Sequence, residues 1–559
     1  KFNFLLLYQN NFIFMLKKIF LFSFTMLLLN YESVFSKDLY PKNYNIDIIN
    51  YSFEINLNDD DDIISGITTI DLKIKTDNVK SIRLDLISMR EDGKGMVVDY
   101  VKYNDTPVTF THKNDVLLIT VKEINNINTV EVQYHGIPVT GLIIGPNMHG
   151  DRTFFSDNWP NKGRNWLPLV DHPYDKATSE FIVIAPNHYQ VISNGLLIEE
   201  SNLDSNLKRS HWKQSVPISC WLFALGVAEF AVQYVDNFDG KSIQTWVYKQ
   251  DREKGFYDFA IPTKHTLQFF SDYVGPFAYE KLANVQSNSV SGGMESATAI
   301  FYSDVSVTGT RSKRWRNVII HEVAHQWFGN CVTENDWDHV WLSEGFATYF
   351  TLLFREHAYG RDDFVEGLIN SRNSVFKFYK KNKDYTIVHD GLDNMKNVLS
   401  GYIYQKGAWI LHMLRNYIGD VSFNKGIRSY YLNNFNSNTD TESFKKEMEK
   451  ASNIDLTIFF DQWLYKGGNI ILDGNWTYDK KNKEIIINLS QVQNDGYYFS
   501  MPLELKIFYG NEFLSKLEEI KLSPDLKRFI IKSDKEPNQI ILDPSTKLLA
   551  EWNFTKQIK

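Results

Sequence analysis

The chain has 559 residues, of which 43% are apolar, and at roughly 100 to 200 residues per domain we expect about three domains with buried cores. Its formal charge of -8 and its pI near 6.0 leave no large basic surface, which argues against a nucleic-acid partner. Only two cysteines occur, Cys220 and Cys331. We expect them in different domains as buried small side chains, with no disulfide framework.

The first 36 residues do not read as part of a fold. Residues 15–18 form a short positive start, residues 19–29 are an apolar run too short to span a bilayer comfortably, and residues 34–36 suit a cleavage position. We predict a leader and signal peptide over 1–36, and export of the mature chain, periplasmic or secreted, without a stable membrane span. The alternative is an uncleaved membrane anchor, because residues 4–14 are also apolar.

Two segments have the period of two that is typical of half-buried strands. In the first, residues 37–236, apolar residues such as Phe53, Ile55 and Leu57 alternate with polar ones. In the second, residues 470–559, the same alternation returns. We therefore expect an N-terminal β domain and a small C-terminal β domain.

The block between them, residues 237–469, changes to helical spacing. This spacing is found in residues 256–274, 315–332, 344–359 and 404–417. The fold class that we predict is therefore a multidomain α+β chain in which the central domain is mostly helical.

The pattern with the clearest chemistry is HEVAH at 321–325. Residues four apart on a helix share a face, so His321 and His325 can bind one ion, and Glu322 is displaced around the axis towards a water on that ion. The alternative is a pair of surface histidines on an ordinary helix. The pattern by itself does not decide between these two readings.

A third ligand is available nearby. Glu344 lies in WLSEG, which begins a second helix, nineteen residues after His325. Two histidines and one glutamate favour zinc over ions that prefer only oxygen ligands, and they leave one tetrahedral position open. We expect Glu322 to act as a general base on water that the ion has made more acidic, so that a peptide bond is hydrolysed without a covalent intermediate.

Further motifs accompany these residues at characteristic spacings: GGME at 292–295, HEVAHQWFGN at 321–330, WLSEG at 341–345, YQKG at 404–407, and FFDQW at 459–463 followed by Gly467 and Gly468. Together they resemble the gluzincin aminopeptidases, the family that includes aminopeptidase N and the leukotriene-hydrolase branch. The resemblance covers most of residues 40 to 550.

The resemblance implies a β-sandwich-like N-terminal domain, a thermolysin-like catalytic domain and a small C-terminal β-sandwich. Larger members continue with a helical superdomain, and we expect none here because little sequence follows the C-terminal β domain. The resemblance also implies one zinc ion per chain, peptide substrates with a free N-terminus, and removal of their residues one at a time.

The resemblance also assigns roles around the metal. Glu295 is expected to bind the α-ammonium of the substrate, since a buried carboxylate at a fixed distance from zinc selects the first peptide bond. The backbone of Gly292 and Gly293, beside Met294, is expected to approach the peptide closely. Tyr404 is expected to donate its hydroxyl to the oxyanion. The alternatives are a simple loop carboxylate and a buried structural tyrosine.

Three positions depart from the family pattern. Ser296 stands where the family usually has asparagine. Relatives often place a glutamine or glutamate of the N-terminal domain against the substrate amine, and in the comparable residues 155–160 we choose Asp157. Thr351, seven residues after Glu344, replaces an acid that often supports a zinc histidine.

Three other functions are weighed against the aminopeptidase. The chain would be a zinc endopeptidase if Glu295 did not face the substrate. It would be an epoxide hydrolase if it followed a few relatives, although nothing in the sequence favours this. A scaffold without activity is disfavoured because the histidines, the glutamates and Tyr404 are all present.

Overall fold

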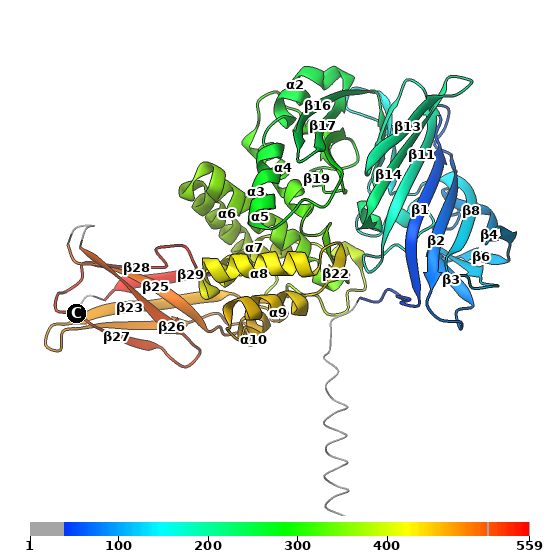
Figure 1. The fold of residues 1–559 in the computed structure, drawn as a ribbon. Coiled ribbons are helices and arrows are strands. Elements are labelled where there is room, and N and C mark those ends of the chain that lie inside the picture. The colour runs from blue at the N-terminus through cyan, green and yellow to red at the C-terminus, as the bar shows by residue number, and fades with distance from the viewer. Residues whose placement is uncertain (1–37, 511–513, 558–559) are drawn as a thin grey trace, which may run out of the picture.

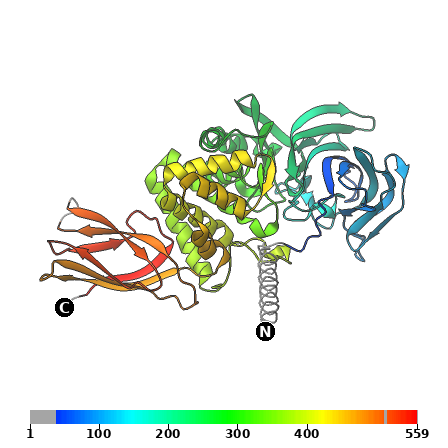
Figure 2. The ribbon, with the colours of Figure 1, turned by 60° about the horizontal axis from the view of Figure 1, so that its bottom comes forward.

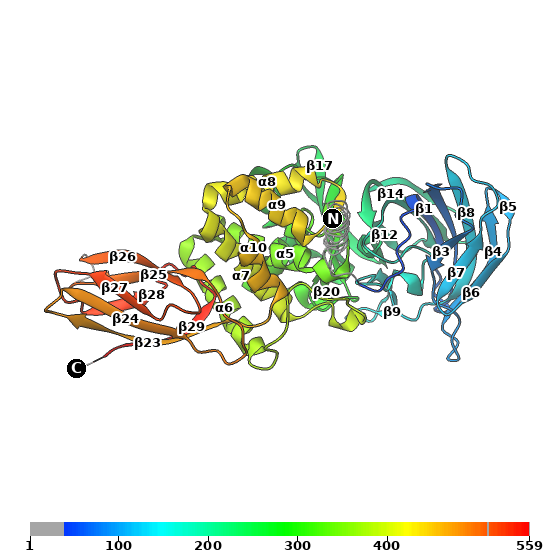
Figure 3. The same cartoon turned by 90° about the horizontal axis from the view of Figure 1, so that it is seen from below.

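The computed structural model describes residues 38–510 and 514–557. The leader expected over residues 1–36 lies outside this range. The described chain forms three regions in a row, and the helical region lies between two β regions in all three views (Figures 1, 2 and 3). The architecture is thus mixed, with a sheet-rich N-terminal region and a helical central region.

The N-terminal region contains three sheets. The largest has the order β13 (Leu196–Asn202), β14 (Leu207–Ser219), β11 (Lys176–Pro186), β1 (Ile46–Asn56), β2 (Ile64–Ile74), β8 (Asn128–Ile137), β4 (Gly95–Tyr103) and β5 (Thr106–Pro107). The second sheet has the order β12 (Gln190–Ser193), β15 (Leu225–Ala228), β10 (Arg152–Ser156) and β9 (Leu142–Pro146). The third has the order β3 (Ser81–Asp85), β7 (Val116–Thr120) and β6 (Phe110–Lys113). Within β1 the register shifts between Ile48 and Asn50, so Ile48 and Phe53 are both buried although their numbers differ in parity.

The central region begins with a five-stranded sheet of order β16 (Phe230–Phe238), β17 (Lys241–Tyr248), β18 (Lys281–Ser287), β20 (Ala299–Ser303) and β19 (Gly293–Met294). Residue 236, after which the sequence predicts a domain boundary, lies within β16, which pairs with β17 of this sheet.

The helices that follow are α2 (Arg252–Phe259), α3 (Thr263–Tyr273), α4 (Lys313–His325), α5 (Trp341–Tyr359), α6 (Arg361–Tyr379), α7 (Gly401–Ile418), α8 (Asp420–Asn433), α9 (Thr441–Ser452) and α10 (Thr457–Phe460). The helical spacing expected up to residue 332 is wrong at its end, because α4 stops at His325 and Gly329 takes a φ of 106° in the loop that follows. The start of α5 at Trp341 agrees with the sequence prediction.

The C-terminal region contains two sheets. One has the order β27 (Arg528–Lys532), β24 (Glu484–Gln491), β23 (Ile470–Asp479) and β29 (Ala550–Lys556). The other has the order β26 (Ser515–Leu522), β25 (Met501–Phe508) and β28 (Gln539–Leu542). Alternate residues of β25 are buried. Cys220 and Cys331 are buried free thiols, as expected. In the described part of the chain, no helix is both long enough and apolar enough to cross a membrane.

Candidate metal centre

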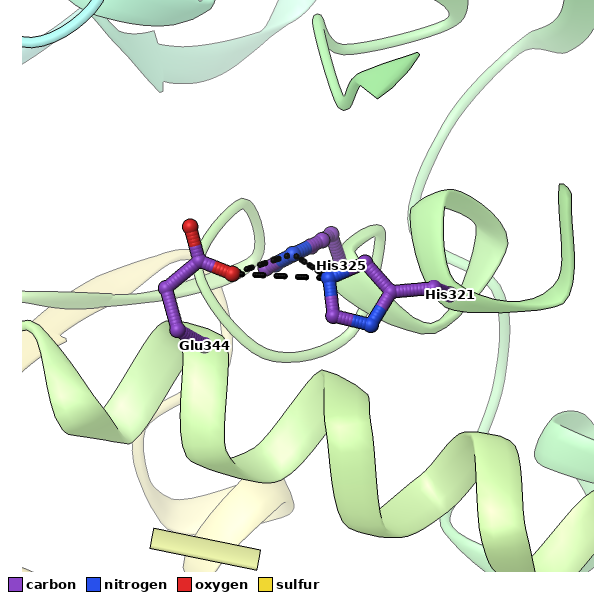
Figure 4. A group of neighbouring side chains, drawn as sticks. All are labelled: His321, His325 and Glu344. Carbon is purple, nitrogen blue, oxygen red and sulfur yellow. Dashed lines mark hydrogen bonds and ion pairs between the residues drawn. The ribbon is translucent and has the colours of Figure 1, made fainter. Parts of the chain in front are cut away.

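His321 and His325 of α4 and Glu344 of α5 point toward one another (Figure 4). Nε2 of His325 lies 3.1 Å from Nε2 of His321 and 3.2 Å from Oε2 of Glu344, and the third edge of the triangle is 3.4 Å. Zinc bonds of about 2.0–2.1 Å at tetrahedral angles separate ligand atoms by about 3.3–3.4 Å. The triangle therefore has the size that a tetrahedral zinc ion requires.

The protonation of His325 supports the same fit. Its Nδ1 lies 3.1 Å from the carbonyl oxygen of Phe328 and 3.1 Å from Oγ of Ser343. A carbonyl oxygen only accepts hydrogen bonds, so Nδ1 is the donor to Phe328, and the neutral imidazole with its proton on Nδ1 has its lone pair on Nε2, toward the centre. Oε2 of Glu344 is buried there and receives no hydrogen bond from a described residue. Two imidazole nitrogens and a carboxylate oxygen that converge on one point suit a bound cation.

A contact between two glycines brings a further helix to the centre. A β-carbon added to Gly407 of α7 would lie 2.9 Å from the Cα of Gly345 in α5, so only glycines allow this approach of the two backbones. Tyr404 precedes Gly407 by about one helical turn and Glu344 directly precedes Gly345. The contact thereby places the Tyr404 hydroxyl 2.7 Å from Oε1 of Glu344, to which it donates.

Glu322 faces the centre from α4 and is 5% exposed. Its carboxylate packs against Gly293 of β19, where an added β-carbon would lie 2.2 Å from Oε1. The sequence led us to expect that Gly293 makes room for the peptide. In the structure its missing side chain makes room for Glu322.

Glu295 lies on the same side as Glu322. Ligand atoms of Glu295, Glu322 and His325 are within 4.8 Å of one another. The backbone carbonyl of Glu295 accepts hydrogen bonds from Gln326 Nε2 at 3.0 Å and Asn330 Nδ2 at 2.7 Å, which hold the segment in place. Oε1 of Glu295 is buried and has no hydrogen-bond partner among residues 38–510 and 514–557.

Burial and the charges of neighbouring carboxylates raise the pKa values of Glu295 and Glu322. Burial raises the pKa of Glu295 to about 7, and the charge of Asp157 adds to this rise. Burial also raises the pKa of Glu322 above its ordinary value, and the charge of Glu295 adds to it. Burial lowers the pKa of His321, which favours the neutral imidazole that a metal binds.

Asp157 follows β10 in the N-terminal region, and its carboxylate forms an ion pair with Lys162. The loop after β10 contacts the central region, where Ser289 Oγ donates to the Ser156 carbonyl at 3.1 Å, but Asp157 itself does not line the cavity. Thr351 lines the same cavity as the metal ligands, but its hydroxyl donates to the Ala347 carbonyl at 2.8 Å and supports no histidine. Ser296 is buried beside Glu295.

The other residues of the glycine-rich segment divide between surface and core. Gly292 lines the cavity and has no neighbour within 4 Å of an added β-carbon. Met294 pairs with Phe301 in the sheet and is 6% exposed.

Sequence reasoning missed the residues that hold the reactive groups in position. Ser343 and the Phe328 carbonyl orient His325, and Gln326 and Asn330 orient the backbone of Glu295. Gln326 and Asn330 are fully buried polar residues inside the quoted HEVAHQWFGN motif. A polar side chain within such an apolar stretch was the available signal.

Comparison with known proteins places two segments of the chain in one peptidase family. Residues 41–222 match the Peptidase M1 N-terminal domain, and residues 259–463 match the Peptidase family M1 domain. The chain is 27% identical to the glutamyl aminopeptidase of Rattus norvegicus over 371 residues, which cover 62% of this chain and 39% of that protein.

Two further relatives give the same picture. Identity is 28% with the glutamyl aminopeptidase of Homo sapiens over 369 residues, covering 62% of this chain and 38% of that protein. Identity is 26% with aminopeptidase M1 of Arabidopsis thaliana over 408 residues, which cover 65% of this chain and 45% of that protein. The chain spans less than half the length of each of these relatives.

Proposed function

The chain belongs to the M1 family of peptidases, and from this membership we propose that it is a zinc-dependent aminopeptidase that removes residues from the N-terminus of peptides. The zinc ligands in this proposal are His321, His325 and Glu344, with one ion per chain. The observation that carries the proposal is the buried carboxylate of Glu295 beside them, whose Oε1 has no partner among the described residues.

A count of charges supports an amine as the partner of Glu295. Glu295, Glu322 and Glu344 contribute three negative charges when ionised, and the two histidines are neutral as ligands. Zinc supplies two positive charges, so one remains to be balanced. The free α-ammonium of a peptide supplies that charge, whereas an internal peptide bond supplies none.

Each residue then has a definite task. Zinc at such a site supplies a Lewis acid that polarises a carbonyl and acidifies water. Glu322, held against Gly293, takes the proton of the attacking water and passes it to the leaving amine. Tyr404, whose hydroxyl lies beside Glu344, donates to the oxyanion after it exchanges that partner.

Other details remain part of the proposal. The substrates are peptides with a free N-terminus, and Asp157 assists Glu295 if Lys162 gives way to the substrate amine. The N-terminal sheets and the C-terminal sheets are proposed to be sandwich-like. Export of the chain rests on the sequence pattern of residues 1–36, and N-terminal sequencing of the mature protein tests it.

The decisive experiment compares a peptide with its N-acetylated form. Acetylation removes the α-ammonium and leaves every other group unchanged, so an aminopeptidase loses its substrate and an endopeptidase does not. We expect stepwise release of N-terminal residues from the free peptide and none from the acetylated one. Cleavage of both at equal rates would establish an endopeptidase instead.

A further inference from the structure

The metal centre opens into a cavity of about 620 Å³ that continues well beyond the ligands. Along α5 the cavity is lined by Glu344, Thr348, Thr351, Leu352 and Arg355. Each of these positions is one, three or four residues after the one before it, so together they form one face of the helix. The cavity therefore runs lengthwise along α5, from the metal ligands at one end to Arg355 at the other.

The guanidinium of Arg355 lies at the end of this cavity, and only some of its nitrogen atoms have hydrogen-bond partners. Its side chain is 9% exposed, its Nε donates to Oδ1 of Asp363 at 2.6 Å, and its Nη2 donates to the Asp363 carbonyl at 2.8 Å. Its Nη1 has no hydrogen-bond or ion-pair partner in the described chain. The Asp363 carboxylate also pairs with Lys313 at 3.1 Å, so it is shared between two cations.

The wall of α6 is shaped to admit this guanidinium. A β-carbon added to Gly367 would lie 2.8 Å from Nη1, so only glycine leaves the space that Nη1 occupies. Asn370 and Ser374, farther along the same helix, add an amide and a hydroxyl to the cavity wall. A wall of this kind suits the polar backbone of a peptide and a carboxylate at its end.

The length of the cavity indicates where that carboxylate lies. Arg355 follows Glu344 by eleven residues, which corresponds to about 16 Å along a helix. Its side chain leans back toward the helix N-terminus, so its guanidinium lies closer to Glu344 than its Cα does. An extended peptide covers about 10 Å in three residues. A group about three residues beyond the cleaved bond therefore reaches the guanidinium.

We propose that this cavity receives the leaving part of the peptide and that Arg355 binds a carboxylate there, about three residues beyond the cleaved bond. The inference rests on the proposed aminopeptidase function and adds a substrate class to it. The carboxylate has two possible sources, the C-terminus of a short peptide and an acidic side chain of a longer one. Both offer the two oxygens that a guanidinium recognises.

The test measures kcat/KM for pairs of peptides that differ only in that charge. One series contains alanine peptides of three to six residues, each as a free acid and as a C-terminal amide. The other contains amidated hexapeptides with Glu or Gln at the fourth position. We expect the charged member to be preferred about tenfold at the matching length, because charge-assisted hydrogen bonds strengthen binding by this order.

Arg355→Gln should reduce this preference to about one, and Arg355→Lys should retain part of it because the charge remains. Both peptides of a pair meet the same enzyme preparation, so any loss of folded protein cancels from the ratio. Arg361→Gln is the matched control, since Arg361 pairs with Glu356 outside the cavity. It should keep the wild-type ratio.

A preference in the free-acid series alone identifies the C-terminal carboxylate, and a preference in the Glu series alone identifies an acidic side chain. Equal rates within every pair for the wild type would overturn the inference and leave the proposed aminopeptidase intact. A preference that survives in Arg355→Gln would also overturn it. Absence of hydrolysis of all peptides would reject both proposals.

Discussion

The carboxylate of Glu322 rests directly on the Cα of Gly293, at a place where a β-carbon would stand 2.2 Å from Oε1. Gly293→Ala must therefore displace the proposed general base. We expect kcat to fall about 100-fold, since a displacement of about 1 Å at a reacting group has an effect of this size. Steady-state kinetics measure the loss, and the thermal midpoint should stay close to wild type because Gly293 borders the cavity.

Gly145→Ala is the control for this substitution, because an added β-carbon at Gly145 meets nothing within 4 Å. A Gly293→Ala enzyme with unchanged kcat would show that the contact with Glu322 has no role in the reaction.

Glu322→Gln separates general-base chemistry from metal binding. Glu322 is not among the three proposed ligands, so the variant should bind one zinc per chain while kcat falls at least about a thousandfold. Metal analysis of the purified variant tests its zinc content, and its kinetics test the loss of kcat.

Chelation of the wild type should abolish activity, and added zinc should restore it. Activity that resists complete metal removal would contradict the zinc mechanism.

Ser343→Ala should weaken zinc binding without removing a ligand. The Ser343 hydroxyl lies 3.1 Å from Nδ1 of His325, on the side of the ring that faces away from the centre. Groups that orient a ligand histidine typically contribute about 10- to 100-fold to affinity, and we expect the lower figure because the Phe328 carbonyl remains. Competition with a chromogenic chelator measures it.

The control for Ser343 is Ser452→Ala in α9, which removes a serine hydroxyl that donates to the Met448 carbonyl and contacts no metal ligand. Equal zinc affinities in the wild type and Ser343→Ala would mean that Phe328 alone orients the ring.

Lys281 should make stability depend on pH. Its Nζ is buried and donates to the Ser193 carbonyl at 2.8 Å, and burial lowers its pKa to about 7. An unfolded lysine keeps a pKa of about 10.4, so between these values the unfolded state binds more protons. The stability contributed by neutral Lys281 is therefore complete above about pH 10.4 and is lost as pH falls through about 7.

Thermal unfolding of the wild type and of Lys281→Met between pH 7 and pH 9 tests this dependence. The free energy of unfolding of the wild type relative to the variant should rise with pH, by at most about 1.4 kcal/mol per unit. Lys264→Met, which removes an exposed lysine of α3, is the control. Parallel curves for the wild type and Lys281→Met would contradict the expected titration.

The sequence alone determined the parts of this protein that depend on local geometry. The spacing of His321 and His325 places both imidazoles on one helix face wherever that helix lies, because helical periodicity is a property of the backbone. The start of α5 at Trp341 was predictable for the same reason, and it brought Glu344 into consideration. Alternation likewise indicated the β regions before and after the helices.

Only the tertiary structure decided the contacts between residues that are distant in the chain. Gly293 meets Glu322, Gly407 meets Gly345, and neither pairing follows from a local pattern. The contact of the loop after β10 with the central region, made by Ser289 Oγ and the Ser156 carbonyl, likewise depends on how the two regions pack.

Arg355 gives the same lesson at the far end of the cavity, because its sequence neighbours are those of an ordinary buried helix. Side-chain packing between α5 and α6 sets Nη1 against Gly367 and places Arg355 in the cavity wall, and packing is a property of the whole assembled core. The sequence thus specified which chemical groups are present and which of them share a helix face. The close approach of separate elements decided which of them face one another.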